Sequence, residues 1–85
     1  MTLIAKLDRH GKLVRSMAEA VDADLPAAIA HGDLSAEGLR GAVLRCTTCE
    51  AAEQCETWLA ERGDTPAEAT PDYCRNADLF ARLRS

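Results

Sequence analysis

Four cysteines are the residues of this chain whose type and spacing indicate chemistry. They are Cys46, Cys49, Cys55 and Cys74, in the pattern C-x2-C-x5-C-x18-C, and all lie in the second half of an 85-residue chain. Four thiolates are the right number to fill the coordination shell of one Zn²⁺ ion or of one [4Fe-4S] cluster. Any function is therefore sought first at these cysteines.

The spacing of the cysteines separates these two centres only in part. Structural zinc sites commonly use two C-x2-C pairs, whereas this chain has one such pair, Cys46 and Cys49, followed by two single cysteines. The pair also lacks the glycine that tight zinc knuckles often contain. We predict that the four cysteines ligate one [4Fe-4S] cluster, with Zn²⁺ as the alternative cofactor.

Four residues near the cysteines are predicted to support the centre. The guanidinium groups of Arg45 and Arg75 would offset the negative charge of a thiolate-bound metal, although both fit equally well as ordinary solvated side chains. Trp58, one helical turn after the third cysteine, would shield sulfur from water, but a tryptophan at this position is more often a core residue. Asn76 is placed to cap the last predicted helix.

Size and composition indicate a single small domain, residues 1–85, with a thin core. Trp58, Tyr73 and Phe80 are the only aromatic residues, and many of the hydrophobic residues are alanines. Small scaffolds commonly need a metal or disulfides for stability. A four-cysteine centre would supply such a crosslink.

Charge and hydropathy indicate in which compartment the protein works and which classes of partner it binds. Charges interrupt the N-terminal sequence from Lys6 onward, so it contains no run long enough for a signal peptide or a membrane span. We expect a cytoplasmic protein, where clustered thiols are metal ligands or redox groups before they are disulfides. The net charge is −4 and only residues 1–15 are basic, which argues against a nucleic-acid binder. The basic stretch is interpreted as a solvated helix face rather than a docking patch.

Helical periodicity predicts an all-α fold, a compact bundle of four to five short helices stapled by the four-cysteine site. Asp24 and Ser35 are predicted N-caps, Gly32 and Gly63 are predicted helix ends, and Thr65–Glu68 has the pattern of a capping box. The predicted helices are residues 4–22, 25–31, from the Ser35 cap to about 46, 51–62, and a last helix after Asn76.

The metal hypothesis requires a break between the third and fourth predicted helices. In one continuous helix, Cys46 and Cys55 would be nine residues apart, and at about 100° per residue they would lie on opposite faces. They could then not share one centre. We therefore expect the chain to turn near Cys49.

The order of these motifs resembles a family of small, functionally uncharacterised four-cysteine proteins found mainly in proteobacteria. The resemblance covers roughly residues 3–83 and implies that the four cysteines act as a unit within one domain, but it implies no activity. The segments that carry it are Asp24 to Ser35, Arg45 to Leu59, and Pro71 to Leu83, which includes Cys74 and Asn76.

No arrangement typical of an enzyme is found. His10 and His31 lie alone on different predicted helices and are interpreted as surface or capping residues, with His31 the one considered for a mixed-ligand site. No histidine is flanked by carboxylates at helical spacing, and no glycine-rich phosphate loop is present. We therefore predict a non-enzymatic protein.

Three functions stay open. The leading hypothesis is a [4Fe-4S] protein for electron transfer or for redox or iron sensing, acting on a protein partner that the sequence does not identify. The second is a zinc-stabilised helical module that binds a protein partner through an exposed apolar face. The third is a thiol-disulfide switch at Cys46 and Cys49, which needs a thiol of lowered pKa. The predicted place of this pair, at a helix C-terminus, disfavours a thiolate.

Overall fold

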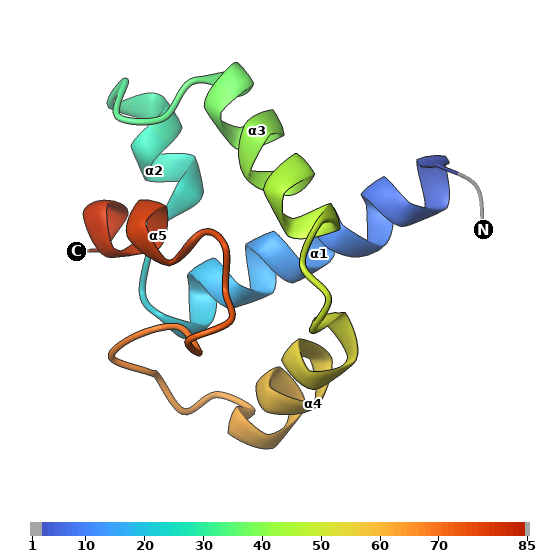
Figure 1. Ribbon diagram of the computed structural model, residues 1–85. Helices are drawn as coiled ribbons and strands as arrows, with labels where there is room; N and C mark the ends of the chain where they lie inside the picture. The colour runs from blue at the N-terminus through green and yellow to red at the C-terminus, as the bar shows by residue number, and fades with distance from the viewer. Residues whose placement is uncertain (1–2, 85) are drawn as a thin grey trace.

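The computed structural model describes residues 3–84, and this part of the chain contains five helices and no strand (Figure 1). An isolated bridge joins Ala23 to Arg84. The all-α fold predicted from the helical periodicity is therefore confirmed. The helices are α1 (Leu3–Ala20), α2 (Leu25–Ala30), α3 (Ala36–Thr47), α4 (Ala52–Arg62) and α5 (Ala77–Leu83).

Side-chain caps fix where two of the helices begin. The Asp24 carboxylate accepts a hydrogen bond of 3.0 Å from the N–H of Ala27, and the Ser35 hydroxyl oxygen accepts one of 2.9 Å from the N–H of Gly38. Each cap satisfies a backbone donor that has no partner within the helix. Gly32, with φ of 80°, follows α2 in the left-handed conformation that glycine adopts most readily. Both caps and this stop agree with the sequence prediction.

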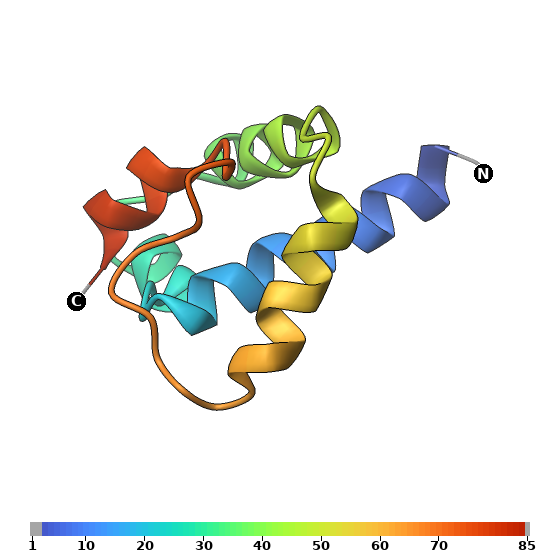
Figure 2. The ribbon, with the colours of Figure 1, turned by 60° about the horizontal axis from the view of Figure 1, so that its bottom comes forward.

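Helix α1 is the element on which the rest of the bundle packs. Both α3 and α4 lie against it (Figures 1 and 2). Its apolar stripe is buried, with Val14 and Met17 each 2% exposed, and Phe80 of α5 joins the same core cluster at 1% exposed. On the outer side, Arg9 of α1 forms an ion pair with Glu56 of α4. All five helices contribute residues to this core cluster.

The connection between α4 and α5 is long and contains no helix (Figure 2). The capping-box pattern at Thr65–Glu68 does not begin a helical turn. Instead Ala67 is buried, and its N–H donates a hydrogen bond of 2.7 Å to the carbonyl oxygen of Ala20. This tertiary contact uses a donor that a helical turn would leave exposed, and it anchors the connection at the end of α1.

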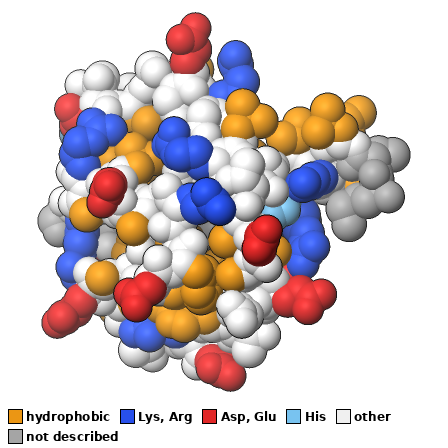
Figure 3. Space-filling view, in the orientation of Figure 1, with side chains coloured by type: hydrophobic (Ala, Val, Ile, Leu, Met, Phe, Trp, Pro, Cys, Tyr) orange, Lys and Arg blue, Asp and Glu red, His pale blue; other side chains and the backbone are white. Residues whose placement is uncertain are grey.

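The face of the molecule shown in Figure 3 carries charges of both signs, with apolar areas between them. The N-terminal end of α1 projects beyond the other helices (Figure 1), and Leu3 and Ile4 there are largely exposed. Leu44 of α3 is also exposed. Within residues 3–84, none of the helices combines the length and the apolar character that crossing a membrane requires.

Candidate metal centre

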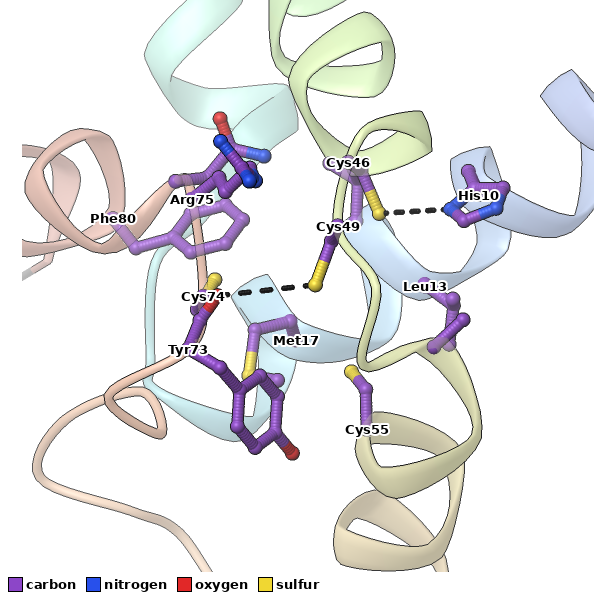
Figure 4. Close-up of a pocket in the computed structure, with 13 residues that line it drawn as sticks. His10, Leu13, Met17, Cys46, Cys49, Cys55, Tyr73, Cys74, Arg75 and Phe80 are labelled. Carbon is purple, nitrogen blue, oxygen red and sulfur yellow. Dashed lines mark hydrogen bonds between the residues drawn. The ribbon is translucent and has the colours of Figure 1, made fainter.

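The four cysteines come from four separate places in the fold and line a single pocket (Figure 4). Cys46 lies in the last turn of α3, Cys49 in the link to α4, Cys55 in the first turns of α4, and Cys74 in the turn before α5. All four are free thiols. Their sulfur atoms surround a common space, to which the chain returns after the long connection.

The turn between α3 and α4 is what lets Cys46 and Cys55 face the same pocket. Helix α3 ends at Thr47 and α4 begins at Ala52, so the break that the metal hypothesis required is present. The hydroxyl groups of Thr47 and Thr48 donate hydrogen bonds of 2.6 and 2.7 Å to carbonyl oxygens one turn back. These bonds help to satisfy the carbonyl groups at the end of the helix, of which that of Arg45 also accepts a hydrogen bond from the N–H of Thr48.

The other walls of the pocket are mostly apolar. Leu13, Val14 and Met17 line it from α1, and Phe80 lines it from α5. The space left between these side chains and the sulfur atoms is about 30 Å³. Tyr73 also lines the pocket, and its buried hydroxyl group has no hydrogen-bond partner within the described part of the chain. Such walls exclude water and strengthen electrostatic interactions inside the pocket.

Burial favours the protonated form of three thiols, those of Cys46, Cys55 and Cys74, when no metal is bound. Burial, and to a smaller extent the neighbouring thiols, raises the pKa of Cys46 and of Cys55 from 9.0 to about 11. Burial also raises the pKa of Cys74, which hydrogen bonds from the backbone of Asn76 and the side chain of Thr70 partly oppose. A bound cation would reverse this preference, because metal ligation deprotonates a thiol.

One backbone donor already points at sulfur. The N–H of Ala51 donates a hydrogen bond of 3.4 Å to the sulfur of Cys49. The S–H of Cys49 donates a hydrogen bond to the carbonyl oxygen of Tyr73, with 3.8 Å between the sulfur and the oxygen (Figure 4). The second contact links the α3–α4 turn to the segment that carries Cys74. N–H donors of the first kind stabilise thiolates and tune the potentials of iron-sulfur centres.

His10 lies on the wall of this pocket, which corrects its interpretation as a surface or capping residue. The side chain is 4% exposed, and its Nδ1 atom lies 3.3 Å from the sulfur of Cys46 (Figure 4). The sequence did contain the signal, because position 10 is three residues after Leu7 and four before Val14, on the apolar stripe of α1. His31 is exposed at the end of α2 and does not line the pocket.

The surroundings of His10 favour the neutral imidazole. Burial lowers the pKa of His10, and the positive charges of Arg9 and Lys6 lower it further. A neutral imidazole carries one N–H and one lone pair. The ring can therefore either accept a hydrogen bond from a thiol or donate one to a thiolate.

Asn76 does not cap α5 with its side chain, contrary to the prediction. It is 3% exposed, and its Nδ2 donates a hydrogen bond of 2.8 Å to the carbonyl oxygen of Ala42 in α3. Its Oδ1 accepts one of 2.8 Å from the Nε of Arg45. The amide group thus connects the segment carrying Cys74 to the helix carrying Cys46.

Of the other two residues predicted to support the centre, Arg75 and Trp58, only the first lines the pocket. Trp58 lies outside the pocket lining, is partly buried against the hydrophobic core, and has the guanidinium of Arg62 above its ring, 4.7 Å from the centroid. The placement of Trp58 matches the core alternative for this residue.

The donor set and the pocket can be compared with the two proposed centres. Within residues 3–84, no three His, Cys, Asp or Glu side chains are arranged to hold one metal ion. A zinc ion needs its four sulfurs at about 2.3 Å from one point, so these side chains would have to close in on it. In a [4Fe-4S] cluster each thiolate binds a different iron, and the sulfurs stand farther apart around the cube. Four thiols around an apolar pocket match both centres in their donor chemistry.

The fold and the site together define a small all-α protein with a four-cysteine pocket. The chain belongs to a family of unknown function, DUF6455, whose model matches residues 1–85. This agrees with the resemblance to an uncharacterised family. No curated protein and no solved structure matches the chain.

Proposed function

We propose that this protein is a non-enzymatic iron-sulfur protein for electron transfer or for redox or iron sensing. In this proposal Cys46, Cys49, Cys55 and Cys74 ligate one [4Fe-4S] cluster. The observation that carries the proposal is that four thiols from four places in the fold line one apolar pocket. Thiolates are soft ligands that select such clusters or zinc, and a bound cluster supplies one-electron chemistry.

The surrounding residues have distinct roles in this proposal. The apolar side chains of α1 and α5 keep water from the sulfur atoms. The N–H of Ala51 stabilises the Cys49 thiolate through the hydrogen bond described above. Four thiolates around a [4Fe-4S]²⁺ cluster leave a charge of about −2, because the four negative charges exceed the two positive ones. Arg75 at the pocket offsets part of that charge.

The thiol-disulfide switch receives less support. A thiol switch needs a thiolate of lowered pKa, whereas burial raises the pKa of Cys46 to about 11. Cys46 also lies in the last turn of α3, where the helix dipole disfavours a negative charge.

A zinc-stabilised interaction module is the second candidate, and one observation favours it. The connection from Gly63 to Asn76 contains no helix, and Cys74 lies near its end. A single ion that joined Cys74 to the other cysteines would hold this segment, as structural zinc does in small domains. The exposed apolar residues Leu3, Ile4 and Leu44 would then be available to a protein partner.

Anaerobic purification followed by elemental analysis and a visible spectrum tests the proposal. We expect a brown protein that contains iron and acid-labile sulfide in equal amounts and bleaches on reduction. Cys55→Ser should abolish the colour. Thr48→Ser is the control, because it lies between Cys46 and Cys49 and keeps the hydroxyl group at the end of α3, and it should keep the colour. Colourless protein with one equivalent of zinc would contradict the cluster and support the second candidate.

The same preparation separates electron transfer from sensing. Repeated reduction and reoxidation with the cluster intact would support electron transfer. Loss of the cluster on exposure to oxidant, together with a change in helix content, would support sensing, because metal binding and folding are coupled in small domains.

A further inference from the structure

The contact between His10 and Cys46 is not accounted for by packing alone. The imidazole occupies a position on the buried stripe of α1 where an apolar side chain would also fit. Its Nδ1 atom is nevertheless aimed at the sulfur of Cys46, 3.3 Å away, across the interface of α1 and α3 (Figure 4). A polar side chain that is 4% exposed and oriented toward a proposed ligand indicates a role in that site.

The proton in this contact has to change place when a metal centre is bound. In the metal-free protein the Cys46 thiol can donate its S–H to Nδ1. A thiolate bound to metal has only lone pairs, so the same contact is favourable only when Nδ1 carries the hydrogen. The neutral ring meets this need with the tautomer that has its proton on Nδ1, and the thiol proton leaves to solvent.

We propose that His10 is a positioning residue of the metal centre, whose Nδ1–H donates a hydrogen bond to the Cys46 thiolate and raises the reduction potential of the bound cluster. This inference rests on the proposed function. The physical reason is that reduction adds negative charge, part of which is carried by the thiolate sulfur. A donor to that sulfur therefore stabilises the reduced state more than the oxidised state.

Three variants test the inference through the reduction potential of the loaded protein. His10→Leu removes the donor and keeps an apolar side chain on the stripe. His10→Asn keeps an N–H group close to the position of Nδ1. His31→Leu removes the exposed histidine of α2 and is the matched control.

We expect His10→Leu to lower the reduction potential. A tenfold change in the redox equilibrium corresponds to about 59 mV for a one-electron couple, and a shift approaching this size is expected. His10→Asn should restore part of the shift, and the control should leave the potential unchanged. A structural role alone would lower the stability of the metal-free protein without moving the potential, so thermal unfolding is measured beside each titration.

The outcomes separate failure of this inference from failure of the proposed function. Wild-type protein that binds no cluster overturns both. A wild-type cluster with the same potential in His10→Leu overturns the role of His10 alone. Loss of the cluster in both His10 variants, with retention in Cys46→Ser, would make His10 a ligand and overturn the hydrogen-bond role.

A measurement on the wild type covers the case in which the variants do not fold. Ring-nitrogen NMR of His10 in the oxidised, loaded protein reports which nitrogen carries the proton. A proton on Nδ1 supports the proposal. A ring protonated only on Nε2 overturns it.

Discussion

The side chain of Asn76 donates a hydrogen bond of 2.8 Å to the carbonyl oxygen of Ala42, across 34 positions of sequence. Ala42 is fully buried in α3, one turn before Cys46, and Asn76 follows Cys74 by two residues. A single amide group therefore sets the distance between two of the proposed ligands. The C-terminal segment is held at the site even when no metal is bound.

Replacing Asn76 should weaken this connection measurably. We expect Asn76→Ala to lower the free energy of unfolding of the metal-free protein by about 1 to 3 kcal/mol, since a buried hydrogen-bonding group is left without its partner. Denaturant titration followed by circular dichroism measures the change. Asp72→Ala, an exposed residue on the same segment, is the control. Equal effects of the two changes would contradict the role assigned to Asn76.

Cys74 is predicted to couple the metal centre to α5. In the loaded wild type, we expect the amide groups of α5 to exchange more slowly with solvent than in the metal-free protein, because the ligand just before the helix is fixed. Cys74→Ser should abolish this difference. Hydrogen exchange of residues 77–83 measures it. Unchanged metal content and unchanged protection in the variant would count against Cys74 as a ligand.

The buried thiols should make the metal-free protein sensitive to alkaline pH. The pKa of Cys46 and Cys55 is raised from 9.0 to about 11 in the folded state. Above pH 9 the unfolded chain has therefore lost protons that the folded state still holds, so the stability falls as the pH rises from 9 to 11. Urea titrations across that range should show a falling midpoint. A constant midpoint would mean that burial does not perturb these thiols.

The same burial predicts slow alkylation of the folded, metal-free protein. Only a small fraction of Cys46 and Cys55 is thiolate at pH 8, and the thiolate is the reactive form. We expect iodoacetamide to modify both residues much more slowly in the folded protein than in urea, as measured by mass spectrometry of the peptides. Rapid modification of the folded protein would instead favour the thiol-disulfide switch.

Truncation of Phe80 should leave the metal-free protein only marginally stable. It is one of the two largest fully buried side chains, and removing a buried phenylalanine side chain typically costs about 3 to 5 kcal/mol. We expect Phe80→Ala to be mostly unfolded without metal and to regain helix content when loaded, as followed by circular dichroism. Leu44→Ala, at a position 52% exposed, should change stability by less than about 0.5 kcal/mol. Full helicity of metal-free Phe80→Ala would contradict the thin-core argument.

The sequence was sufficient for features that depend on neighbouring residues. Asp24 and Ser35 cap helices as predicted, because a cap is formed within four residues. The turn between Cys46 and Cys55 was required by helix geometry and is present. The shared pocket of the cysteines follows from that turn together with the return of the chain at Cys74.

The features that were missed depend on distant contacts. Asn76 has the pattern of a cap, but its hydrogen bonds go to residues of α3 that no local pattern identifies. The N–H of Ala67 likewise bonds to the end of α1 instead of starting a helical turn. His10 is within reach of sequence reasoning, since it lies on the apolar stripe of α1, but a histidine that stands alone on its helix is interpreted as a surface or capping residue.

The length of the α4–α5 connection has a consequence for how the proposed centre is lost. The first three proposed ligands of the centre are separated by only two and five residues, whereas 18 residues separate Cys55 from Cys74. The hydrogen bond of Asn76 holds this longer ring closed in the folded protein. When that bond opens, the entropy lost on closing the ring opposes the return of Cys74, so we expect the C-terminal ligand to be the first to detach as the fold loosens. Loss of this one ligand would leave one coordination position of the centre open to an outside molecule while the other three cysteines stay bound.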